Sequence, residues 1–131
     1  MKRQRVKKIL SASNMSATPF HPTIADCVRW SEVLNYIMFD GALPKWRKIT
    51  VKKLRAWAYC IGNTTPKRKK KYCTLEMNDK FDSFAAFYSV LAHEMCHAAE
   101  YHELEEIKHG SFFLSHKEML AGVGIKLKLC Y

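Results

Sequence analysis

An apolar stripe of helical period, between residues 83 and 102, constrains the fold of this chain more than any other feature. Its members recur at spacings of three and four: Phe84, Phe87, Tyr88, Leu91, Met95 and Ala98. This spacing predicts a helix with one face in the core, and Asp82 or Ser83 can cap its first turn. Because the chain has only 131 residues, we expect one domain with a single core.

The opposite face of this helix carries the pattern H-E-x-x-H, formed by His93, Glu94 and His97. At about 100° of rotation per residue, the two histidines lie roughly 40° apart and about 180° to 220° from Phe84. Two imidazoles four residues apart can bind one metal ion, and zinc fits because one further ligand still leaves an open position. Glu94 can reach a water on that ion. The alternative is a helix with two solvated histidines, which would have no reason to lie opposite the stripe.

The third metal ligand has to come from outside this helix. We favour His109, which follows a polar loop and precedes Gly110, where the backbone can approach closely. His116 and Glu118 are the alternatives. Cys96 is better interpreted as a buried thiol, because a fourth protein ligand would close the open position.

Local patterns predict the remaining elements and place them in an α+β order. The expected elements are a helix from Thr23 as N-cap to about Phe39, three strands over 48–54, 56–61 and 72–77, the H-E-x-x-H helix, and a further C-terminal helix over 111–121. We expect the strands to form a small, mostly antiparallel sheet. Residues 1–18 read as a basic flexible tail and residues 19–131 as the domain.

Positive charge is concentrated in the first half of the chain. The formal net charge is +10, but residues 1–72 hold 17 Lys and Arg against 3 acids, and residues 73–131 hold 5 against 9. Such clusters favour contacts with DNA phosphates, which do not depend on the base sequence. The alternative is a charged face that contacts only solvent. The candidate nucleic-acid-binding residues are Lys45, Arg47, Lys48, Lys52, Lys53, Lys67, Arg68, Lys69, Lys70 and Lys71. Trp46 and Trp57 could stack on bases or belong to the core.

Composition and cysteine spacing exclude several classes of protein. No apolar run approaches the roughly 18 residues of a membrane span, and we expect no signal peptide, because only Ile9 and Leu10 follow the basic start before a polar stretch. The five cysteines include no C-x-x-C pair, which argues against a disulfide framework and a zinc ribbon. We therefore expect an intracellular protein with free thiols, cytoplasmic or DNA-associated, and nuclear if the source is eukaryotic.

Three segments in order make the sequence similar to the SprT-like metalloprotease family, which includes the Spartan proteases of DNA–protein crosslink repair. They are residues 39–44 (F-D-G-A-L-P), residues 91–98 with H-E-M-C-H-A, and residues 109–113 (H-G-S-F-F). The resemblance covers about residues 22–124. It implies a small zincin-like domain, zinc bound by His93, His97 and His109, and Glu94 as catalytic acid/base. It also implies DNA-stimulated cleavage of proteins on DNA.

Because the sequence contains no C-x-x-C pair, we do not expect the cysteine zinc ribbon that follows the protease core in many family members. We then expect the basic clusters to supply any DNA contact of that module. Two other functions stay open: a zinc-stabilised nucleic-acid-binding module without proteolytic role, and a general peptidase not linked to DNA.

Two supporting roles also stay open. Glu100, one turn after His97, could accept the second ring N–H of that histidine or could be a solvated charge. The candidates for a second donor to a reacting carbonyl, each with packing as the alternative, are Tyr72, Tyr88 and Tyr101.

Overall fold

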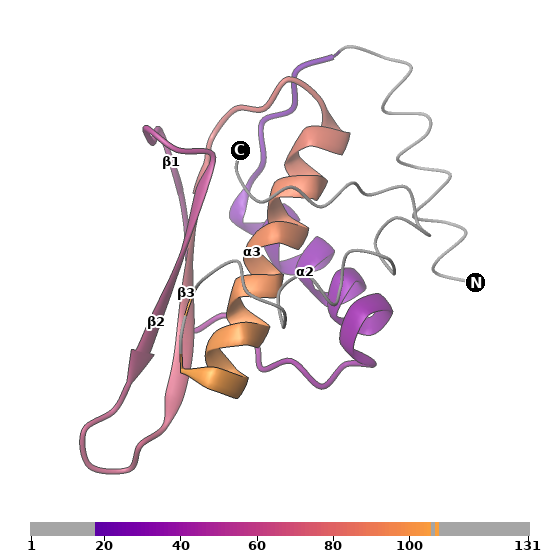
Figure 1. Ribbon diagram of the computed structural model, residues 1–131. Coiled ribbons are helices and arrows are strands. Elements are labelled where there is room, and N and C mark those ends of the chain that lie inside the picture. The colour runs from indigo at the N-terminus through magenta and orange to yellow at the C-terminus, as the bar shows by residue number, and fades with distance from the viewer. Residues whose placement is uncertain (1–17, 106, 108–131) are drawn as a thin grey trace.

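The computed structural model describes residues 18–105 and 107, and these form two helices and three strands. In chain order the elements are α2 (Ile24–Phe39), β1 (Lys48–Lys52), β2 (Ala58–Thr64), β3 (Lys71–Asn78) and α3 (Phe84–Leu104). Both helices lie on the same side of the sheet (Figure 1). The predicted α+β order of a helix, three strands and a further helix is therefore confirmed, and the predicted last helix lies outside the described residues.

The sheet is mixed rather than mostly antiparallel. Its strand order is β1-β3-β2, with β1 parallel and β2 antiparallel to β3. The strand β3 takes the central position because it is the most apolar on its inner side, where Cys73, Leu75 and Met77 are all buried. The consecutive strands β1 and β2 consequently do not pair, which a local sequence pattern cannot reveal.

The helix α3 packs on the inner face of the sheet against β2 and β3, beside α2, which contacts β1 (Figure 1). The apolar stripe predicted from the sequence is buried, with Tyr88 and Leu91 fully inaccessible to solvent. Burial extends around the helix, since every residue from 90 to 101 is buried. The face that carries the histidines is therefore enclosed as well. Among the residues that the structure describes, no helix is long and apolar enough to cross a membrane.

Side-chain caps determine where both helices begin. The Thr23 hydroxyl accepts a hydrogen bond from the Asp26 amide at 3.1 Å, and the Asp26 carboxylate accepts one from the Thr23 amide at 3.0 Å. This reciprocal pair is a capping box. Of the two caps considered for α3, Ser83 is the one used, accepting from the Ala86 amide at 3.1 Å. Such caps contribute about 1 kcal/mol each.

The segment 39–44 is tied back onto α2 by one side chain. Asn35 donates from Nδ2 to the Leu43 carbonyl at 2.8 Å and accepts at Oδ1 from the Leu43 amide at 3.0 Å. Gly41 has a φ of +81°, a conformation that favours glycine. Further along, the Trp46 indole donates to the Ser31 hydroxyl at 3.0 Å and packs against the core. Trp46 is thus a packing residue that leads the chain into β1.

Candidate metal centre

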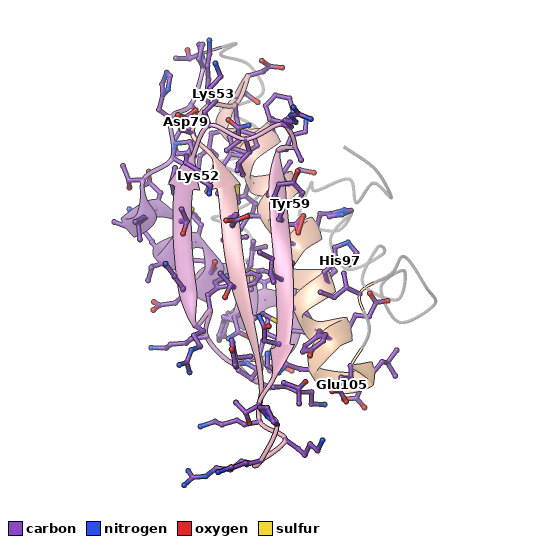
Figure 2. All side chains as sticks on the ribbon, turned by 90° about the vertical axis from the view of Figure 1, so that its left-hand side faces the viewer. Lys52, Lys53, Tyr59, Asp79, His97 and Glu105 are labelled. Carbon is purple, nitrogen blue, oxygen red and sulfur yellow. The ribbon has the colours of Figure 1, made fainter. Side chains whose placement is uncertain are left out.

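His93 and His97 converge on one point within a buried turn of α3. Their Nε2 atoms are 3.1 Å apart, and the ring planes cross at 82° with centroids 4.7 Å apart. Two nitrogen ligands at 2.0–2.1 Å from a tetrahedral zinc ion lie roughly 3.3 Å apart, so this pair has the spacing that such an ion requires. The spacing also suits a hydrogen bond in which one ring donates to the other. Figure 2 shows His97 on α3 beside the β2 edge of the sheet.

Glu94 shares this enclosed environment with the two histidines. Each of the three side chains belongs to a residue that is only 6% exposed. Burial raises the pKa of Glu94 to about 7, because a carboxylate loses solvation there. A carboxyl group with a pKa near neutrality can both accept and release a proton, which is the property a general acid/base needs.

Glu100 is fully buried and supports His97 from the following turn. Its Oε1 lies 3.4 Å from Nδ1 of His97. A carboxylate at this position favours the tautomer in which Nδ1 carries the proton, and the Nε2 lone pair then faces His93. Of the two interpretations open for Glu100, the structure favours the positioning role and contradicts the solvated charge.

Cys96 and two of the candidate tyrosines have packing roles. Cys96 is fully buried, and burial raises the pKa of its thiol, so it stays protonated as expected for an inert core residue. Tyr88 packs edge-on against Trp30, with centroids 5.3 Å apart. The Tyr101 hydroxyl shares a hydrogen bond of 2.6 Å with Oγ1 of Thr64 on β2.

The third ligand cannot be placed among the described residues. His109, His116 and Glu118 all lie outside them. Within residues 18–105 and 107, no cluster of three metal-ligating side chains occurs. The described part of the chain therefore supplies two nitrogen donors and a carboxyl group, and His109 remains a prediction.

The structure separates the ten candidate nucleic-acid-binding residues into two groups. Nine are exposed, either around β1 or in the turn between β2 and β3. Lys71 is instead half-buried, and its Nζ donates a hydrogen bond to the His102 carbonyl at the end of α3. This anchoring role was not predicted, because inward and outward positions at a strand end depend on the register.

Comparison with known proteins identifies the family of this chain. The SprT-like family model matches residues 28–129, and the chain belongs to that family, which is generally of metallopeptidase type. Searches of curated proteins and of solved structures gave no match.

Proposed function

We propose that this protein is a zinc-dependent endopeptidase of the SprT-like type. The observation that carries the proposal is the convergence of the His93 and His97 Nε2 atoms, 3.1 Å apart, in a buried turn that also holds Glu94. His109 completes the ligand set in this proposal. Zinc, when bound, polarises a carbonyl and acidifies water, and the protein residues supply the rest.

His93, His97, Glu94 and Glu100 have distinct roles in this mechanism. His93 and His97 provide the nitrogen donors, and Glu100 keeps the second of these rings in the tautomer with a free Nε2 lone pair. Glu94 accepts a proton from the attacking water and returns it to the leaving amine as the peptide bond breaks. The enclosure of the turn keeps bulk water away from these groups.

We further propose that the substrates are proteins bound or crosslinked to DNA. The supporting observation is the charge of the sheet region, which holds twelve Lys and Arg against two acids between Lys45 and Lys80. Most of these cations are exposed and available to phosphates. The contact would be independent of base sequence.

The test compares wild type with Glu94→Gln in the cleavage of a basic DNA-binding protein, with and without DNA. We expect the variant to lose about 100-fold or more in rate, because general acid/base catalysis contributes roughly 10²–10⁴. Glu103→Gln is the matched control, since Glu103 is an exposed acid on the same helix. Equal cleavage by wild type and Glu94→Gln would contradict the mechanism. Cleavage that does not respond to DNA would contradict the proposed substrate class.

A further inference from the structure

The outer face of the sheet is not covered by any described element. Both helices pack on the inner face (Figure 1), against the alternating side chains of Cys73, Leu75 and Met77. The residues between them on β3, including Tyr72 and Thr74, point to the other side. Figure 2 looks onto this outer face, with Lys52 and Tyr59 on it.

The outer face carries basic side chains on β1 and large apolar side chains on β2. Register places Lys48 opposite Thr74, and Thr74 opposite Ile61 on β2. The neighbouring row carries Tyr59. Tyr59 is 43% exposed and Ile61 is 41% exposed. A sheet face that turned only to solvent would carry polar residues at these positions, so exposed tyrosine and isoleucine indicate a surface that contacts a partner.

The charges on this face are almost all positive. The guanidinium of Arg47 lies over the Tyr72 ring, 4.7 Å from its centroid. Glu76 is the sole acid on the three strands, and Lys52 lies 3.5 Å from its carboxylate, so its negative charge is offset. A cationic surface that exposes aromatic rings is complementary to an anion that also has aromatic groups.

A basic hairpin extends this surface beyond the end of the sheet. The turn between β2 and β3 projects away from both helices, as Figures 1 and 2 show. Its exposed residues are Lys67, Arg68, Lys69 and Lys70. The base of the hairpin is fixed to α3 by two hydrogen bonds. Lys71 donates to the His102 carbonyl, and the Thr64 hydroxyl shares a hydrogen bond with the Tyr101 hydroxyl.

We propose that this outer sheet face binds a single-stranded nucleic acid. Unpaired bases stack on Tyr59 and on the Tyr72–Arg47 pair, while the lysines of β1 and of the hairpin contact phosphates. A duplex keeps its bases stacked internally and could use only the phosphate contacts. The inference deepens the nucleic-acid part of the proposed function. It uses none of the residues around the histidines, so binding and hydrolysis can fail independently.

The first test measures fluorescence anisotropy of labelled 20-mers with the full chain. Single-stranded DNA, single-stranded RNA and duplex DNA are the three arms. We expect Tyr59→Ala to weaken single-strand binding roughly 5- to 100-fold and to leave duplex binding unchanged, because only stacking is lost. Tyr36→Ala is the matched control, since Tyr36 on α2 is 49% exposed on the other layer.

Tyr59→Leu separates stacking from folding, because it keeps an apolar side chain on the strand. The inference requires that Tyr59→Leu melts like wild type and still binds single strands more weakly. Wild-type affinity in Tyr59→Leu, or equal losses in Tyr59→Ala and Tyr36→Ala, would overturn it. A stronger effect on RNA than on DNA would support the same face and identify RNA as the ligand.

The second test removes charge. Replacing the four hairpin residues 67–70 with serine should flatten the dependence of the logarithm of affinity on the logarithm of salt concentration, by about 0.7 for each lost phosphate contact. Arg29→Ala, on α2, is the control for loss of positive charge on the opposite layer. An unchanged salt slope in the hairpin variant would contradict the placement of the phosphates.

Discussion

Glu100 and His97 illustrate how one buried residue determines the chemistry of another. The carboxylate lies 3.4 Å from Nδ1 of His97 and has no solvent exposure. The sequence left its role open, because helical spacing shows that the two side chains can meet but not whether water reaches them. Burial depends on what packs against α3 from elsewhere in the chain.

Glu100→Gln therefore tests the positioning role directly. The amide has nearly the same shape but no charge to hold the Nδ1 proton of His97. We expect zinc affinity to fall about 10- to 100-fold, as measured by competition with a chromophoric chelator. Glu103→Gln should bind zinc like wild type. Unchanged affinity in Glu100→Gln would reduce Glu100 to a packing residue.

His102 makes the stability of the folded protein depend on pH. Burial, and then the positive charge of Lys71, lower the pKa of His102 below its usual 6.5. Between the two pKa values the unfolded chain binds a proton at His102 and the folded chain does not. The contribution of neutral His102 to stability is therefore complete above pH 6.5 and is lost as pH falls through the folded pKa.

We expect Lys71→Met to raise the pKa of His102, as followed by NMR titration of its ring. Urea unfolding of His102→Gln should show a smaller loss of stability than wild type between pH 7 and pH 5. A His102 that titrates at or above 6.5 in the wild-type protein would contradict this prediction.

Helices and strands that are encoded by nearby residues were predicted well, whereas strand pairing and strand ends, which depend on distant contacts, were not. The helix over Ile24–Phe39 and its Thr23 cap were predicted because the capping residues and the apolar period lie within a few positions of each other. The strands were predicted in number, but β2 runs to Thr64 rather than to residue 61. The parallel pairing of β1 with β3 brings together residues 26 positions apart, as in Lys48 and Thr74, and no short pattern records it.

Close contact between β2 and α3 makes Gly62 a sensitive position. A Cβ on Gly62 would lie 2.6 Å from Cγ of the Tyr101 ring, which is itself held through its hydroxyl. We expect Gly62→Ala to destabilise the protein by about 1–3 kcal/mol in urea unfolding, because the ring cannot retreat. The cost should shrink in a Tyr101→Leu background. Equal costs in the two backgrounds would mean that the ring is not the obstacle.

The whole molecule has two regions with different chemistry. The outer face of the sheet, which faces away from α3, is cationic, and a buried turn of α3 holds the two histidines and Glu94. The sheet region between Lys45 and Lys80 accounts for the whole net charge of +10, because it holds twelve cations against two acids and the rest of the chain holds ten of each. In the sequence this division appears as an imbalance between the two halves of the chain, and in the structure the exposed cations of the sheet region lie mostly around β1 and in the turn between β2 and β3.

The zinc content of the purified protein tests zinc binding by His93 and His97 most directly. Such binding predicts one zinc per chain by elemental analysis in wild type and in Glu94→Gln, and loss of zinc in the His93→Ala, His97→Ala double variant. The same double variant with a full complement of zinc, or a wild-type protein that takes up none from zinc-containing buffer, would contradict it.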